Sequence, residues 1–119
     1  MDTEISNYLT RTGNMEWTAL VEEGACTTGI FVKILRFDEV QQRPPSILLK
    51  FEPGAGYPYH NHPGGEELFV TKGSCLVNDH LLNAGDYLYT PPGFKHAVKT
   101  TTGCEIIFIV PEEVEIAEK

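Results

Sequence analysis

Short runs rich in β-branched and aromatic residues alternate with turn-forming residues along most of the chain. Signals built on glycine, proline, asparagine and aspartate recur about every 8–12 residues, a spacing typical of an all-β sandwich or barrel. The only stretch with any helical periodicity follows Pro111. The expected strands are residues 15–21, 29–37, 46–52, 67–72, 75–77, 87–90, 95–100 and 104–110. The sequence therefore predicts an all-β fold.

The length of 119 residues predicts a single domain spanning residues 1–119, because domains commonly hold about 100–150 residues. Residues 1–14 are expected to form an N-terminal arm that ends at Gly13 and Asn14. Residues 111–119 form an acidic tail, which we expect to be a solvated end. Its acidic residues are Glu112, Glu113, Glu115 and Glu118.

The charge of the chain excludes several classes of partner. A formal net charge of −8 repels phosphate backbones, so no nucleic-acid partner is expected. No apolar run approaches the roughly 20 residues of a membrane helix, so no membrane partner is expected either. The first ten residues are acidic and polar and do not resemble a signal peptide. A cytoplasmic location is therefore predicted.

The three cysteines do not form a metal or disulfide pattern. Cys26, Cys75 and Cys104 are odd in number and contain no Cys-x-x-Cys pair, which argues against a disulfide framework and a zinc ribbon. We expect all three to be small buried hydrophobic residues, since free cysteine is among the most buried residue types.

The stretch from Gly54 to Gly73 contains the main chemical signal. His60 and His62 lie two apart, so on a strand both imidazoles point to the same face. The turn 63–65 then reverses the chain and returns Glu66 or Glu67 toward them. Imidazole and carboxylate together suit a first-row transition metal such as iron, zinc, nickel, copper or manganese.

A third histidine completes this pattern. His96 follows a strand-like run and a rigid Pro-Pro-Gly turn, whereas His80 lies between two turn signals and is expected in an exposed loop. Aromatic residues flank both motifs, and none of them is assigned a role in a pocket. Tyr57 and Tyr59 have the opposite parity to the motif histidines, so they are expected to point out of the barrel.

These residues resemble the two motifs of the cupin superfamily. The first motif falls on Gly54, His60, His62, Glu66 and Gly73. The second falls on Gly85, Pro91, Gly93 and His96, with Thr100 where the family has asparagine. Among cupins, the local sequence of these motifs is most similar to that of the cupin domains of zinc-binding anti-sigma factors and of small diketone-cleaving dioxygenases. The resemblance implies a double-stranded β-helix, a jelly-roll barrel with a metal in its mouth.

The resemblance also implies a ligand set of His60, His62, Glu66 and His96. The motif's spacing back from Gly73 selects Glu66 over its neighbour. Parity agrees, because Glu66 shares a strand face with two apolar residues. Thr100 replaces an asparagine that is not a ligand in most members, so its replacement costs at most an outer contact.

Three functions are compatible with such a site. The first is an iron-dependent dioxygenase acting on a small organic molecule such as a diketone, with one divalent transition metal per chain. Iron or zinc is favoured over nickel or manganese. The second is a zinc-binding sensor or regulatory module without catalysis. The third is a sugar isomerase or epimerase, which has less support because the arginines Arg11, Arg36 and Arg43 all lie outside the motifs.

The segment 29–37 predicts a homodimer. Its two faces are both apolar, and one barrel can cover only one of them. Leaving the other face exposed would create a larger apolar patch than monomers usually tolerate. The resemblance agrees, since small cupins commonly pair through their N-terminal strands.

Overall fold

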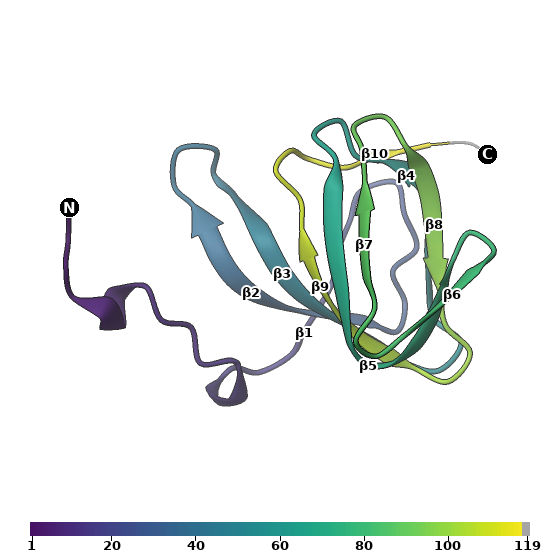
Figure 1. Cartoon of the computed structure of the whole chain (residues 1–119), viewed down its shortest axis with the longest axis horizontal. Coiled ribbons are helices and arrows are strands. Elements are labelled where there is room, and N and C mark those ends of the chain that lie inside the picture. The colour runs from purple at the N-terminus through teal and green to yellow at the C-terminus, as the bar shows by residue number, and fades with distance from the viewer. Residues whose placement is uncertain (118–119) are drawn as a thin grey trace.

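The computed structural model describes residues 1–117, and β-strands form the body of the molecule (Figure 1). Within this described part, the only helical elements are two 3₁₀ turns, Ile5–Asn7 and Thr12–Asn14. The strands are β1 (Thr18–Ala19), β2 (Ile30–Asp38), β3 (Arg43–Phe51), β4 (Gly56–Asn61), β5 (Glu66–Val77), β6 (His80–Asn83), β7 (Tyr87–Thr90), β8 (Lys95–Lys99), β9 (Cys104–Ile109) and β10 (Glu115–Ile116).

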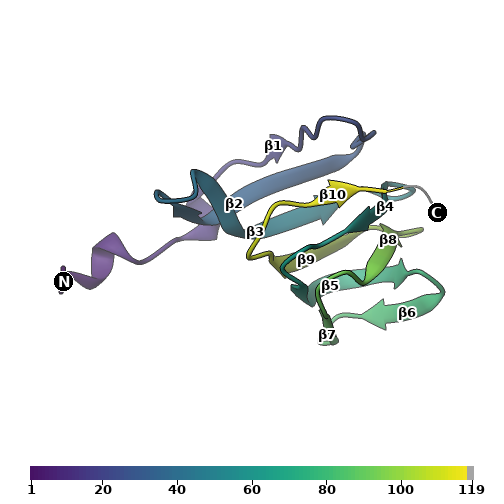
Figure 2. The ribbon, with the colours of Figure 1, turned by 90° about the horizontal axis from the view of Figure 1, so that it is seen from above.

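The strands form one strongly curled antiparallel sheet. Its order is β1–β2–β3–β9–β5–β8–β4–β10, and both β6 and β7 pair with β5. Seen from two directions, the sheet folds over so that β4, β8 and β10 face β2, β3 and β9 across the interior (Figures 1 and 2). The predicted all-β barrel is confirmed.

Strand β5 is continuous and changes partners at Gly73. Up to Gly73 it pairs with β7 and β9, whereas residues 74–77 pair with β6 and β8. Gly73 has a φ of 72°, which glycine adopts without steric cost. Residues 67–72 and 75–77, expected as two separate strands that would pair as a hairpin, are therefore one strand, because the glycine bends the chain without reversing it.

Two other strand boundaries differ from the prediction. Pro44 and Pro45 lie inside β3, although the strand was expected to begin only at residue 46. They fall in a bulge of the β2–β3 pairing, where no N–H is needed for the ladder. At the N-terminal side, only Thr18–Ala19 of the expected strand 15–21 pairs with β2.

The core lies between the two layers. Alternate residues of β5 and β9 point into it, including Leu68, Val70 and Ile106, all exposed by 1% or less. Cys75 and Cys104 are buried neighbours in this core, as expected. The expectation is wrong for Cys26, which is exposed in the connection between β1 and β2.

The C-terminal tail is part of the barrel. Strand β10 pairs antiparallel with β4, and the Ala117 N–H donates to the Tyr59 carbonyl oxygen at 3.0 Å. The Asn61 side-chain amide donates to Glu115 at 2.8 Å. Glu112, Glu113 and Glu115 are exposed, as expected of a solvated tail, but residues 115–116 form a strand on the open edge of β4, and no helix forms within residues 111–117. Glu118 lies outside the described residues.

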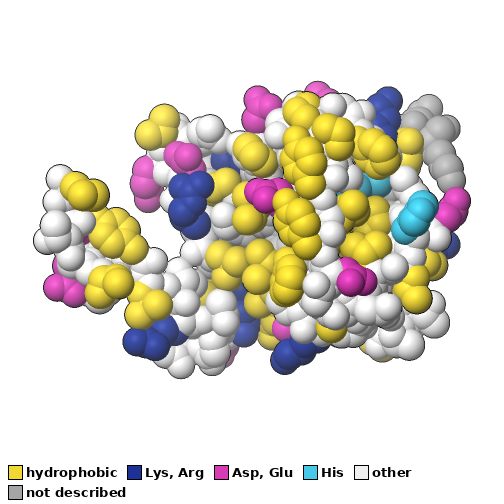
Figure 3. Space-filling model, in the orientation of Figure 1, with side chains coloured by type: hydrophobic (Ala, Val, Ile, Leu, Met, Phe, Trp, Pro, Cys, Tyr) yellow, Lys and Arg dark blue, Asp and Glu magenta, His cyan; other side chains and the backbone are white. Residues whose placement is uncertain are grey.

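Apolar side chains remain exposed on the outside of the molecule. Phe37 of β2 and Phe69 of β5 are 43% and 42% exposed. Figure 3 shows further hydrophobic side chains gathered over β5, β7 and β9. The N-terminal arm, which projects from the body in Figure 1, carries exposed Ile5, Tyr8 and Leu9.

The homodimer predicted from segment 29–37 is thus still a proposal, and these exposed side chains support it. Light scattering at micromolar concentration should give twice the chain mass of 13.3 kDa. A particle of 13.3 kDa would contradict the proposal. No helix within residues 1–117 is long and apolar enough to cross a membrane, and the cytoplasmic location is still a prediction.

Candidate metal centre

Three strands and one tight turn bring the predicted residues together. His60 lies on β4 directly opposite His96 on β8, so the two are cross-strand neighbours. The chain then turns tightly, with the Gly65 N–H donating to the His62 carbonyl oxygen at 3.0 Å. This turn places Glu66, the first residue of β5, beside His62. The positive φ of Gly65, 79°, permits the reversal.

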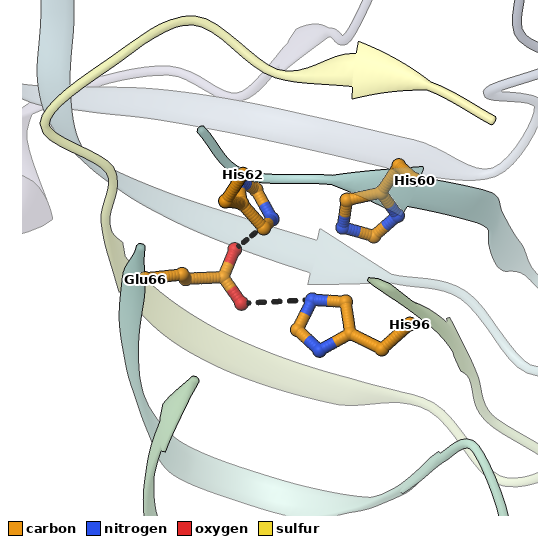
Figure 4. A group of neighbouring side chains, drawn as sticks. All are labelled: His60, His62, Glu66 and His96. Atoms are coloured by element: carbon orange, nitrogen blue, oxygen red, sulfur yellow. Dashed lines mark ion pairs between the residues drawn. The ribbon is translucent and has the colours of Figure 1, made fainter. Parts of the chain in front are cut away.

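The four side chains converge on one point between the layers (Figure 4). The Glu66 carboxylate lies between two imidazoles, 2.7 Å from Nε2 of His62 and 3.1 Å from Nε2 of His96. The ring centroid of His60 lies 4.6 Å from that of His62 and 4.7 Å from that of His96. One possible ligand atom from each residue lies within 4.8 Å of all the others.

The group has the properties of a site that holds a metal. All four residues are at least 96% buried, yet the ring nitrogens of His62 and His96 and one Glu66 oxygen have no hydrogen-bond partner among the described residues. They face one another at short distance without hydrogen-bond alignment. Buried polar atoms without partners are costly, and a shared cation would satisfy one nitrogen of each ring together with the carboxylate oxygen. Imidazole and carboxylate donors suit a divalent transition metal.

The orientation of His60 is fixed by the backbone. Its Nδ1 lies 2.6 Å from the Pro58 carbonyl oxygen. A carbonyl oxygen only accepts hydrogen bonds, so Nδ1 carries the proton and Nε2 is left as the donor atom for a metal. Metal-binding histidines commonly use a carbonyl partner in this way.

The charges within the group favour an ionised glutamate. Burial by itself would raise the pKa of Glu66, but the contacts with His62 and His96 outweigh it and leave the pKa below its usual value. Burial lowers the pKa of His60 to about 4, against the opposing effect of the Pro58 carbonyl. At neutral pH, the group therefore offers an anionic carboxylate and a neutral His60, the forms that bind metals.

The metal-free protein should become less stable as the pH falls from about 6.5 to 4. An unfolded histidine titrates near 6.5, whereas folded His60 titrates at about 4. Between these values the unfolded chain takes up a proton that the folded chain does not, so acid favours unfolding. The shift corresponds to about 3 kcal/mol of the free energy of unfolding. Urea unfolding of chelator-treated protein across this range measures it.

Two variants test the assignment to His60. Replacing His60 with glutamine should flatten the pH dependence between 6.5 and 4, while replacing the exposed His80 should leave it unchanged. An equally steep loss of stability in the His60 variant would mean that another group is responsible.

A cavity of about 480 Å³ opens onto the centre. His60, His62 and Glu66 contribute to its wall, while His96 is completely buried behind them. Most of the remaining lining is aliphatic or aromatic: Leu20, Val21, Val32, Ile34, Ile47, Leu49, Phe51, Val98, Phe108, Val110 and Val114. Such a mostly apolar cavity with a few convergent polar groups is typical of a small-molecule site.

Tyr57 also lines this cavity, contrary to the expectation that it points outward. Its ring stands edge-on to His60, with the centroids 4.7 Å apart. The pairing of β4 with β8 shifts register between Tyr57 and His60, so a bulge reverses the parity of Tyr57. Pro58 is the signal that could have shown this, because proline inside a sheet favours bulges.

The remaining predicted residues lie away from the centre. Glu67 points outward, where it accepts a hydrogen bond from the Tyr87 hydroxyl at 2.7 Å. His80 is exposed, as expected. Thr100 is buried, and its hydroxyl donates to the Ser74 carbonyl at 2.7 Å, so it serves a turn and makes no contact with the cluster.

Comparison with known proteins agrees with this architecture. A family model described as the ChrR cupin-like domain matches residues 6–115. The DNA damage-repair/toleration protein DRT102 of Arabidopsis thaliana is 32% identical over 94 residues, which are 67% of this chain and 30% of that protein. The chain therefore spans less than a third of the length of this relative.

Three solved structures share the fold at low sequence identity. A protein provisionally named acetylacetone dioxygenase from Methylibium petroleiphilum has a TM-score of 0.81 and 18% identity, over 99% of this chain and 85% of its own. The acetylacetone dioxygenase of Acinetobacter johnsonii has a TM-score of 0.76 and 17% identity, over 94% of this chain and 78% of its own. The polyketide cyclase RemF of Streptomyces resistomycificus has a TM-score of 0.72 and 18% identity, over 93% of this chain and 85% of its own. These similarities confirm the jelly-roll barrel.

Proposed function

The chain belongs to the family of ChrR cupin-like domains, and on that premise we propose that it is a metal-dependent enzyme acting on a small organic molecule. His60, His62, Glu66 and His96 would hold one divalent transition metal. The observation that carries the proposal is the placement of this buried group at the wall of a mostly apolar cavity. A metal with only a structural role needs no such cavity beside it.

A dioxygenase reaction fits this arrangement best. Iron(II) held by three imidazoles and one carboxylate supplies dioxygen chemistry, because this ligand set leaves coordination positions open. The aliphatic wall of the cavity excludes water and accommodates the apolar part of a substrate. Two structural neighbours carry the name acetylacetone dioxygenase, which supports a β-diketone or a related ketone as the substrate class.

Tyr57 would orient such a substrate. Burial raises the pKa of Tyr57, and the negative charges of Glu22 and Glu66 act in the same direction. The phenol therefore stays protonated at neutral pH and can donate a hydrogen bond to a substrate oxygen in the cavity. The substrate would be held between this hydroxyl and the metal group, which is the positioning that a two-oxygen molecule such as a diketone needs.

Oxygen uptake tests the proposal. We expect the protein, reconstituted anaerobically with iron(II), to consume oxygen when a member of a β-diketone panel is added. The Glu66→Gln variant should lose this activity, and the neighbouring Glu67→Gln variant should keep it. Absence of uptake across the panel, with iron bound at full occupancy, would contradict a diketone dioxygenase.

A zinc-binding sensor or regulatory module is the second candidate. It is favoured by the family match and by the resemblance to the cupin domains of zinc-binding anti-sigma factors. The metal that co-purifies separates the two candidates, since iron favours the oxygenase and tightly held zinc favours regulation. A sugar isomerase gains no support, because Arg43 is the only cationic residue of the cavity wall among the described residues, and its guanidinium donates to the Val110 carbonyl.

A further inference from the structure

Thr90 is a buried polar residue that the four metal ligands do not account for. It is the last residue of β7 and is 3% exposed, and its hydroxyl has no hydrogen-bond partner among the described residues. The group that could hold a metal does not include this hydroxyl, so a bound metal by itself does not explain it. Because a buried hydroxyl without a partner is costly, its presence here requires an explanation of its own.

Strand pairing places Thr90 directly opposite Glu66. Strand β7 runs antiparallel beside β5 (Figure 1), and the register of the two strands pairs these residues. Directly opposed residues of an antiparallel pair point to the same face, with their Cβ atoms about 4.5–5.5 Å apart. Each of the two residues is only 3% exposed, so this common face is the interior. The side chain of Thr90 is therefore directed inward, beside that of Glu66.

Glu66 is the only polar neighbour of Thr90 on this face of the β5–β7 pair, within the part of the chain that the structure describes. The next inward residues are Leu88 on β7 and Leu68 on β5, which pair with each other. Beyond them, Phe108 of β9 lies opposite Leu68. The carboxylate is thus the one group along these strands that can form a hydrogen bond with the hydroxyl.

Backbone contacts hold Thr90 in this position. A proline follows it, which restricts its backbone to extended conformations, and its β-branched side chain has few rotamers. Its carbonyl oxygen lies 3.1 Å from the position that a Cβ would occupy at Gly65, so the turn before β5 packs closely against it. The Gly93 N–H donates to the His62 carbonyl oxygen at 3.3 Å and joins the turn after β7 to the turn after β4. The position of Thr90 relative to the metal ligands is therefore fixed.

We propose that Thr90 is a positioning residue of the metal centre, whose hydroxyl donates a hydrogen bond to the Glu66 carboxylate when a metal is bound. The two oxygens of this carboxylate face imidazole nitrogens of His62 and His96. A metal that binds both nitrogens needs only one carboxylate oxygen, which frees the other to accept a hydrogen bond. Ligating carboxylates commonly have such a partner, and the charge of the acceptor strengthens the bond. The inference rests on the proposed metal site and is independent of the reaction there.

Zinc affinity and stability together test the inference. Thr90→Val keeps the shape of the side chain and removes the hydroxyl, so we expect it to weaken zinc binding roughly tenfold in competition with a chromogenic chelator. Thr90→Ser keeps the hydroxyl and should retain most of the affinity. After chelator treatment, the Thr90→Val protein should be no less stable in urea than the wild type, because it loses a buried hydroxyl that has no partner.

Thr100→Val is the matched control. Thr100 is also buried, but its hydroxyl donates to the Ser74 carbonyl oxygen at 2.7 Å and accepts a hydrogen bond from the Gly103 N–H at 2.9 Å. Its replacement should lower the midpoint of urea unfolding and leave the zinc affinity unchanged. The two threonines are therefore expected to differ in both measurements.

Unchanged zinc affinity in Thr90→Val would overturn the inference and leave the metal site intact. A loss of affinity that serine does not prevent, or that accompanies a loss of stability in the chelator-treated protein, would also overturn it, since either result indicates a purely structural role. A wild type that binds no zinc would contradict the metal site itself, and this inference with it.

Discussion

Replacing Glu66 with glutamine is expected to weaken metal binding at least about tenfold. Glu66 is 3% exposed, and its two carboxylate oxygens face ring nitrogens of His62 and His96. Glutamine keeps the size of the side chain but removes the only negative charge of the group, so the cation loses an anionic ligand while the packing is preserved. Competition with a chromogenic chelator for zinc measures the affinity of the two proteins.

The neighbouring Glu67→Gln variant is the matched control. Glu67 lies on the opposite face of β5, where it accepts a hydrogen bond from the Tyr87 hydroxyl at 2.7 Å. Its replacement should leave the affinity for zinc nearly unchanged. The reverse order of the two variants would show that the register of β5 is wrong. Equal affinities for all three proteins would show that no glutamate binds the metal.

Most of the metal centre could be predicted because three of its four residues lie close together in the sequence. His60 and His62 lie two apart, and consecutive proline and glycine residues predict the turn before Glu66. Each of these features depends on a few neighbouring residues. His96 required a distant motif, and the resemblance to cupins supplied it. The structure then placed His60 and His96 on adjacent strands as direct neighbours.

The parts of the cavity that the sequence did not predict depend on pairing between distant segments. The orientation of Tyr57 is set by a bulge that exists only where β4 pairs with β8. The pairing of β10 with β4 is another case, because the acidic residues around it give no local sign of a strand. The residues that line the cavity beside the histidines could therefore not be identified from the sequence alone.

The same distinction explains the error at Gly73. A glycine between two apolar runs can either reverse the chain or bend a continuous strand. The residues next to it in the sequence do not distinguish the two. The structure shows that Gly103 decides, because the backbone of the connection between β8 and β9 passes against Gly73. This contact keeps β5 in register with β9 on one side of the bend.

Replacing Gly73 with alanine is therefore expected to lower the free energy of unfolding by at least about 3 kcal/mol. The φ of 72° strains any residue that has a Cβ. A Cβ here would also strike the carbonyl oxygen of Gly103 and come within 3.0 Å of the Cα of Cys104. Both obstacles are backbone atoms, one in the connection before β9 and one in the first residue of β9, so relief requires a shift of the β5–β9 ladder. Urea unfolding followed by circular dichroism measures the loss.

Gly24 provides the control for backbone strain alone. Its φ of 80° is similar, but nothing lies within 4 Å of the position that a Cβ would occupy. Gly24→Ala should therefore cost only about 1 kcal/mol, the penalty for an alanine in the left-handed region. The difference between the two variants isolates the clash with the β8–β9 connection. Equal losses would mean that the ladder yields easily at this point, and that Gly73 is needed only for its φ.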